Sequence, residues 1–174
     1  MSNFEGNMEN DIVNRVENSG LIQVSLDDFY PKGERVVFDI RDCLHEGFVL
    51  IEKPFREFVK NNDWKIYKDK YVAITCSSDA IVPLWAYMLI SSHLKPLAKK
   101  VILGNEADLE KSIFQEVFNQ HDFTIYQDKS VIVKGCGKFP IPESVFVDFT
   151  YRLQEYAKTI MFGEACSAVP LFKR

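Results

Sequence analysis

The chain has 174 residues, of which 47% are hydrophobic and 26% charged, and its net charge is −4 with a pI near 5.4. This length and composition are typical of a globular domain and exclude a disordered chain. The acidic balance and the scattered Lys and Arg residues argue against a nucleic-acid-binding protein. No apolar stretch reaches the length of a transmembrane helix, and the polar N-terminal residues do not resemble a signal or transit peptide. We therefore expect a cytoplasmic protein that binds neither nucleic acid nor membranes.

The sequence predicts one folded domain that follows a short N-terminal segment. We expect residues 1–9 to form a disordered extension and residues 10–174 to form a single α/β domain. A short helix that begins near Asn10 should end at Gly20, because asparagine is a good helix cap and glycine a good helix terminator.

The next segments predict strands at an edge of the sheet. "LIQVSL" (residues 21–26) alternates between apolar and polar residues, as a half-buried strand does. "RVVFDI" (35–40) predicts a second strand, and "FVLI" (48–51) predicts its antiparallel partner in a hairpin. A helix should then begin at Pro54 and end near Asn61.

From residue 71 onward, predicted strands alternate with predicted helices. The strands are "YVAITC" (71–76), "KVILG" (100–104), "SVIVKGC" (130–136) and "KTIMFG" (158–163). The helices are "VPLWAYMLISSHL" (82–94), expected to be buried, the amphipathic "EADLEKSIFQEVFNQ" (106–120) and "PESVFVDFTYRLQEY" (142–156). This alternation indicates an α/β fold: a mainly parallel sheet with helices on both faces and N-terminal antiparallel edge strands.

Three of the four cysteines follow predicted strands. Cys76, Cys136 and Cys166 each come after a β-branched, apolar run and before a proline. Because the carboxyl ends of parallel strands lie along one edge of a sheet, we expect the three thiols to lie along that edge. Thiols from adjacent strands, which are about 4.8 Å apart, could share one metal ion.

A cluster of thiols would select a soft metal, so zinc or an iron–sulfur species is the expected cofactor. Asp79, three residues after Cys76, is the best candidate for a further ligand. Cys43 and His45 in "DCLHE" are weaker candidates. The alternative for each cysteine is simple packing, because free cysteine is among the most often buried residues.

Two other functions fit the same residues. The first is a thiol-dependent enzyme for sulfur transfer or redox exchange, in which Cys76 or Cys136 is activated by the start of the following helix. The second is a non-catalytic protein-binding module, in which the aromatic segment 55–69 contacts a partner. The alternative for that segment is that Phe55, Phe58 and Trp64 pack into the core.

The segments "DFYPKGERVVFDI", "AITCSSDAIVPLWAYML", "VIVKGCGKFPIP" and "IMFGEACSAVPLFK" resemble those of an uncharacterised bacterial family, domain-of-unknown-function family 2480. The resemblance extends from about Asn10 to the C-terminus. It implies a cytoplasmic bacterial protein, and it associates the chain with iron–sulfur cluster assembly proteins, which are the expected partners. It implies no activity and no catalytic residue.

Overall fold

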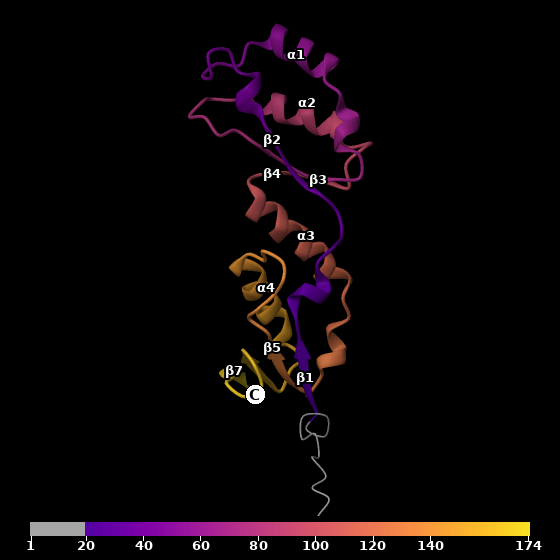
Figure 1. Cartoon of the computed structure of the whole chain (residues 1–174), viewed down its shortest axis with the longest axis vertical. Helices are drawn as coiled ribbons and strands as arrows, with labels where there is room; N and C mark the ends of the chain where they lie inside the picture. Colours follow the sequence, from indigo (N-terminus) through magenta and orange to yellow (C-terminus); the bar gives the residue numbers. More distant parts are fainter. Residues whose placement is uncertain (1–19) are drawn as a thin grey trace, which may run out of the picture. The chain divides into compact units, whose positions relative to one another are not determined.

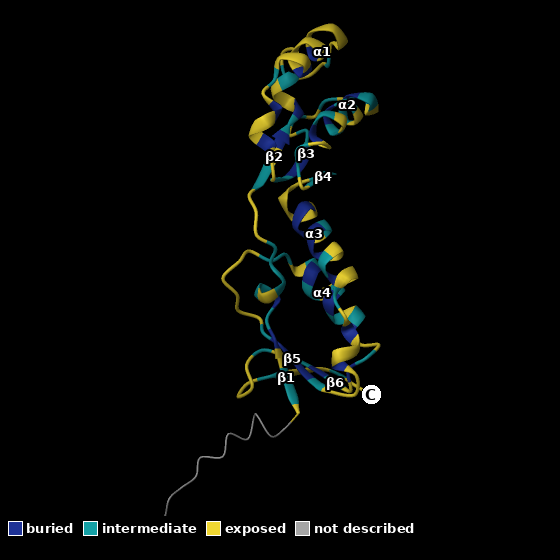
Figure 2. Cartoon of the chain, turned by 90° about the vertical axis from the view of Figure 1, so that its right-hand side faces the viewer, coloured by how far each residue is buried: buried dark blue, intermediate teal, exposed yellow. Residues whose placement is uncertain are grey.

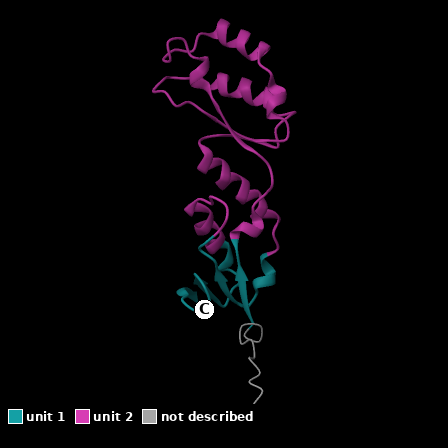
Figure 3. Ribbon diagram, viewed as in Figure 1, with its two compact units in different colours: residues 1–25, 123–136, 152–174 teal, residues 26–122, 137–151 magenta. Residues whose placement is uncertain are grey.

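The computed structural model describes residues 20–174, so the extension expected over residues 1–9 and the helix expected from Asn10 lie outside the described residues. The chain divides into two compact units (Figure 3). Unit 1 contains the described residues up to Ser25 together with residues 123–136 and 152–174, and unit 2 contains residues 26–122 and 137–151. The single domain expected over residues 10–174 stays a prediction.

Unit 1 contains a four-stranded sheet. Its strands, in spatial order, are β1 (Leu21–Val24), β5 (Ser130–Val133), β6 (Thr159–Phe162) and β7 (Val169–Lys173). The first three strands are parallel, and β7 pairs antiparallel with β6. The mixed α/β class and the mainly parallel pairing are thus confirmed, but the antiparallel strand comes from the C-terminal end of the chain.

Unit 2 contains a three-stranded, wholly parallel sheet and most of the helices (Figure 1). Its strands, in spatial order, are β2 (Arg35–Asp39), β3 (Tyr71–Thr75) and β4 (Lys100–Leu103). The helices are α1 (Glu52–Asn61), α2 (Leu84–Leu94), α3 (Glu106–Gln120) and α4 (Glu143–Leu153), of which α4 belongs to unit 2 up to Tyr151. Short 3-10 helices lie at η2 (Leu26–Phe29), η3 (Ile40–Cys43), η4 (Trp64–Tyr67) and η5 (Phe123–Tyr126).

Helices cover both faces of the unit 2 sheet, as the sequence predicts. Successive side chains of a strand point to opposite faces. Val72 and Ile74 of β3 belong to one buried cluster, whereas Ala73 between them belongs to another. The first cluster includes residues of α1 and α2, and the second is formed with Leu109 and Ile113 of α3. Figure 1 accordingly shows the strands between α2 and α3.

α3 illustrates how local sequence fixes an element. The Asn105 side chain accepts a hydrogen bond from the Asp108 amide, and the Asp108 carboxylate accepts one from the Asn105 amide, each at 3.0 Å. This reciprocal capping box satisfies two otherwise unpaired amides at the start of the helix. Apolar residues spaced three and four apart give the helix one buried side, which Figure 2 shows in dark blue.

The antiparallel hairpin expected between residues 35–40 and 48–51 is wrong. β2 pairs parallel with β3, and residues 48–51 form no strand beyond a single bridge between His45 and Val49. The chain leaves β2 at Asp39 for the 3-10 helix η3, and the later turn at Glu46 and Gly47, both with a positive φ, closes only that bridge. The apolar side chains that suggested the strand remain on the surface, with Phe48 69% exposed.

The two sheets belong to an internal repeat, and the cysteines do not occupy equivalent positions in it. Residues 55–104 align without gaps with residues 114–163, at a constant spacing of 59 positions. The positions that are identical at this spacing include Phe55/Phe114, Tyr67/Tyr126, Asp69/Asp128, Pro83/Pro142, Leu94/Leu153 and Gly104/Gly163. The first repeat runs β2–η3–α1–η4–β3–α2–β4, and the second runs β1–η2–α3–η5–β5–α4–β6 in the same order. The first repeat is thus inserted into the second, between η2 and α3.

Backbone geometry follows the same spacing. Asp69 and Asp128 have φ values of 59° and 57°, which are uncommon for any residue other than glycine. The Asp69 amide donates to the Leu97 carbonyl, and the Asp128 amide donates to the Tyr156 carbonyl, each at 3.0 Å. These matched details in a left-handed conformation support a duplicated unit rather than a chance similarity of pattern.

The repeat predicts equal structural roles for Phe55 and Phe114, both about 1% exposed. We expect alanine at either position to lower the free energy of unfolding of unit 2 by about 3–5 kcal/mol, because each change leaves a large cavity. Urea unfolding followed by tryptophan fluorescence measures this, since both tryptophans, Trp64 and Trp85, lie in unit 2. The control Phe48→Ala should change the value by less than about 0.5 kcal/mol. An effect confined to one of the two core positions would contradict the equivalence.

Candidate functional site

The structure distributes the expected metal ligands over both units. Cys76 and Asp79 lie in the loop after β3 in unit 2, whereas Cys136 and Cys166 follow β5 and β6 in unit 1. The three cysteines therefore follow strands of two sheets rather than of one. No group of three or more His, Cys, Asp or Glu side chains that could hold a metal ion occurs within residues 20–174. Metal binding by these residues stays a prediction.

Cys76 is half-buried at the carboxyl edge of the unit 2 sheet. Its Sγ lies 3.3 Å from Ser78 Oγ and 3.6 Å from the Ser78 carbonyl oxygen. Asp39, at the end of the neighbouring strand β2, accepts hydrogen bonds from the amides of Ser77 and Arg41, each at 3.0 Å. Burial acts to raise the pKa of Asp39, but hydrogen bonds from the Ser77 side chain and from the Arg41 and Ser77 amides, together with the Arg41 charge, outweigh it and hold the pKa below its usual value. The carboxylate thus fixes the loop that carries Cys76.

Cys136 and Cys166 are both exposed and follow neighbouring parallel strands of unit 1. The Phe162 side chain of β6 reaches over the loop that carries Cys136, because a Cβ atom built on Gly135 would overlap the Phe162 ring unless the ring moved. The Gly163 amide also donates to the Val133 carbonyl at 2.9 Å. Two of the three expected ligands therefore share one sheet edge.

Cys43 and His45 do not form a paired site. Cys43 ends η3 and is half-buried, whereas the His45 side chain is 63% exposed. Burial, with the nearby negative charges of Asp42 and Asp39, raises the pKa of the Cys43 thiol to about 11. The thiol is therefore protonated at neutral pH and packs as a small apolar group.

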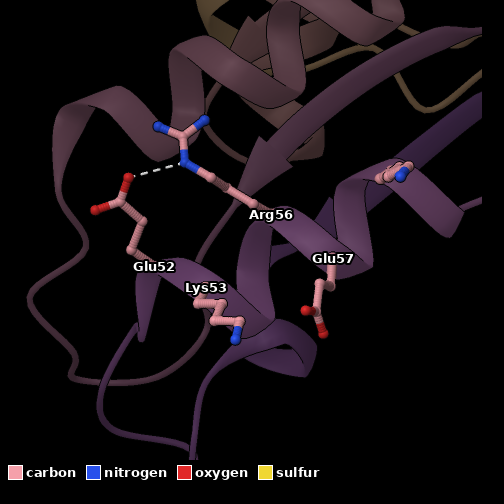
Figure 4. Close-up of a pocket in the computed structure, with 5 residues that line it drawn as sticks. Glu52, Lys53, Arg56 and Glu57 are labelled. Carbon is pink, nitrogen blue, oxygen red and sulfur yellow. Dashed lines mark hydrogen bonds and ion pairs between the residues drawn. The ribbon is translucent and has the colours of Figure 1, made fainter.

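A shallow depression of about 390 Å³ lies on α1 (Figure 4). Its lining residues are Glu52, Lys53, Arg56, Glu57 and Lys60, all on one helix. The Arg56 Nε donates to Glu52 Oε1 at 2.8 Å, across one helical turn. Both side chains are more than half exposed, and such a pair stabilises a helix by only about 0.2–0.5 kcal/mol. This face is a solvated helix surface with charges of both signs.

A second pocket of unit 2, of about 460 Å³, is lined by a buried ion pair. Arg35 Nε donates to Glu110 Oε1 at 2.6 Å, and Tyr30 Oη donates to the same oxygen at 3.2 Å. The Arg35 guanidinium also lies 4.1 Å from the centre of the Tyr30 ring and donates to the Gly33 carbonyl. Both charges are paired within the protein, so the group holds the segment before β2 against α3.

The most distinctive surface of unit 2 is apolar. Ile81, Leu84 and Met88 are 94%, 76% and 70% exposed along α2 and the loop before it, and Leu103 at the end of β4 is 62% exposed. We call these four residues the α2–β4 surface. Met88 and Leu103 line opposite sides of a groove of about 480 Å³ between α2 and β4. Leu84 and Met88, one helical turn apart, lie on the same side of α2, and exposed large apolar side chains that neighbour one another are typical of a protein–protein interaction site.

The expectation that residues 82–94 form a buried helix is therefore only half met. Ala86, Ile90 and Leu94 are fully buried, whereas Leu84 and Met88 face outward. An apolar sequence favours burial on every side, but α2 packs on the sheet with one side only. Val147 in α4, 59 positions after Met88, is likewise 69% exposed, so the two equivalent helices each leave one apolar side chain outward at this position.

Thiol reactivity tests these environments. We expect Cys136 and Cys166 to react fast with a chromogenic disulfide reagent at pH 8, because both thiols are exposed. Cys43 should react slowly and gain reactivity only as the pH approaches about 11, because the thiolate is the reacting form. Counting the fast thiols in each single Cys→Ser variant measures this. A fast phase that is lost in Cys43→Ser would contradict the assignment.

No helix within residues 20–174 is long and apolar enough to cross a membrane. The comparison with curated proteins finds no match. The comparison with solved structures finds none either. The sequence model of one family, described as "Protein of unknown function (DUF2480)", matches residues 10–174. Because that match covers almost the whole length of the sequence, the chain belongs to the DUF2480 family.

Proposed function

We propose that the protein is a protein-binding module that contacts another polypeptide through the α2–β4 surface. The single observation that carries the proposal is the exposure of Ile81, Leu84, Met88 and Leu103 beside a groove. Full burial of a large apolar side chain is worth about 1.5–3 kcal/mol. Four such side chains therefore form an energetic centre of the size that protein interfaces use.

The shape of the surface favours a polypeptide over a small molecule. Its residues lie on the outside of one helix and at the end of one edge strand, and Ile81 is almost wholly exposed. Small molecules prefer sites that enclose most of their surface, whereas protein partners cover open faces such as this one. We place this binding in the cytoplasm, and cluster-assembly proteins are the first partners to test.

Met88→Glu tests the proposal. A charge at the centre of the surface should lower partner binding by more than about tenfold, because it would be buried without a counter-charge. The measurement is quantitative capture from a lysate of the native cells by the tagged full-length protein. The protein that is captured by the wild type and lost from the variant is then identified, and its affinity is determined by calorimetry.

Val147→Glu is the matched control, because Val147 occupies the equivalent helix position in the second repeat and is equally exposed. This control should retain the captured protein. If Val147→Glu loses the protein and Met88→Glu keeps it, the partner binds elsewhere and the proposal is wrong. Circular dichroism shows whether both variants keep the helix content of the wild type.

A second candidate function is metal binding by thiolates of unit 1. The observation that favours it is the placement of exposed Cys136 and Cys166 after neighbouring parallel strands. Two thiolates from one chain would hold a soft ion, with the remaining ligands supplied by another group. Zinc or an iron–sulfur species fits this donor set, and Cys76 and Asp79 in unit 2 remain further expected ligands.

Metal analysis tests this candidate. Protein purified without oxygen should contain zinc or iron, and the content should fall in Cys136→Ser and Cys166→Ser because each variant removes a thiolate. Cys43→Ser is the control, since the raised pKa of Cys43 disfavours a thiolate. A content that is equal in the wild type and in both variants would exclude binding by these two thiols.

A further inference from the structure

The internal repeat exposes a difference between two equivalent strands. β4 and β6 occupy the same place in their repeats, since Lys100–Leu103 and Thr159–Phe162 are 59 positions apart. β6 has a neighbour on each side, β5 and the antiparallel β7. β4 pairs with β3 on one side, and no described residue pairs with its other side. An open edge of this kind is a template for another strand.

The free backbone groups of β4 can be assigned by alternation. The Gly104 amide donates to the Ile74 carbonyl of β3 at 2.9 Å. Backbone groups of successive residues in a strand point to opposite sides. The amides of Leu103 and Val101 therefore point away from β3, toward the open edge. Their equivalents in β6, Phe162 and Ile160, lie in the ladder with β7.

We propose that the partner binds by adding an extended segment to β4 in the antiparallel direction, as β7 adds to β6. This inference rests on the proposed function and names the mode of binding at the same surface. The added strand would complete the ladder through Val101 and Leu103. One row of its side chains would lie in the groove between Met88 and Leu103.

The repeat and the local charge define the chemistry of that segment. β7 contributes the apolar residues Val169, Leu171 and Phe172 to its own pairing, so an apolar strand of about five residues is expected. Lys173 of β7 pairs with Thr159, whose equivalent in β4 is Lys100. Exposed Lys95 also lines the groove. The Lys100 ammonium already pairs with Glu116 of α3, so the positive charge that lines the groove is that of Lys95, and the segment should carry an acidic residue that reaches Lys95.

A second copy of the chain is a poorer fit than an acidic, apolar segment of a different protein. The β7 strand of a second copy is already paired with its own β6. It would also bring the basic residues Lys173 and Arg174 toward the groove lined by Lys95. Charge complementarity thus favours a strand that has apolar residues like those of β7 but carries an acidic residue in place of a basic one.

The test uses a synthetic peptide and the full-length protein, so it does not depend on the partner. The peptide copies residues 167–174 with Arg174→Glu, because residues 172 and 174 take the side of the sheet on which Val101 and Lys95 line the groove. Amide chemical shifts of the ¹⁵N-labelled protein are followed during titration. We expect the largest shifts at Val101 and Leu103, and their hydrogen exchange should slow. The unmodified peptide, with arginine at position 174, should bind about threefold more weakly, because it brings a positive charge rather than a carboxylate to Lys95.

Two variants separate the backbone edge from the side chain. Leu103→Pro removes an outward amide that makes no bond to β3, which an edge strand tolerates. It should weaken peptide binding by about tenfold, because one ladder hydrogen bond and the approach of the strand are lost. Leu103→Ala keeps the amide and loses only the side chain, so it should weaken binding less than Leu103→Pro does. Thermal unfolding should show that both variants remain folded at the titration temperature.

The outcomes separate this inference from the proposed function. No shift in β4 at millimolar peptide, or shifts in β6 through displacement of β7, overturns strand addition. Equal binding by Leu103→Pro and Leu103→Ala overturns it as well. If the β4 shifts grow with protein concentration in the absence of peptide, the edge binds a second copy of the chain. That result overturns the proposal that a segment of a different protein binds there. None of these outcomes affects the proposed function, which depends on partner capture being lost in Met88→Glu. If Met88→Glu captures the partner as well as the wild type does, the proposed function itself is wrong.

Discussion

Each repeat depends on one central strand whose backbone is paired on both sides. β3 lies between β2 and β4, and β5 lies between β1 and β6, all in parallel. The middle residues of both strands are fully buried, so helices must cover each face and neighbouring strands must satisfy each backbone group. The outer strands have no such protection. β6 is covered by β7, whereas β4 has one unpaired side among the described residues. This difference between two equivalent outer strands is the basis for proposing that β4 is a binding edge.

The sequence predicts elements well where its period is strong. The bounds expected for α3, residues 106–120, agree with the structure, because a capping box and an apolar stripe mark that helix. The strands expected at β3, β4, β5 and β6 are also present. Each is a short, β-branched run, which is the pattern of a buried parallel strand.

What the sequence could not predict is which strands pair and which faces remain open. Backbone hydrogen bonds are the same for every residue type, so a strand pattern does not name its neighbour. The expected antiparallel edge strands at the N-terminal end were therefore misplaced, and β7 was missed because Pro170 is unfavourable in a strand. Pro170 is accommodated opposite Met161, where the ladder shifts register. The outward face of α2 was missed because an all-apolar helix gives no sign of its exposed side.

The cysteines and the apolar surface suggest different functions, and the structure gives them unequal support. The three thiols are spread over two units, and Cys43 is held in its protonated form by its surroundings. The α2–β4 surface, in contrast, lies within one unit and next to an unpaired strand edge. Recognition by strand addition would use both features at once, since main-chain bonds supply affinity and the groove supplies selectivity.

The insertion of one repeat inside the other has a consequence for the order of assembly during synthesis. All strands of the first repeat are complete once residue 103 has left the ribosome, whereas β1 must wait for β5, whose first residue, Ser130, pairs with Leu21. Nascent chains gain structure in the order in which contacts become available, and closing a longer loop costs more entropy. The inner repeat is thus able to form while β1 still lacks its neighbour β5. During that time β1 is the strand of the nascent chain most exposed to mispairing.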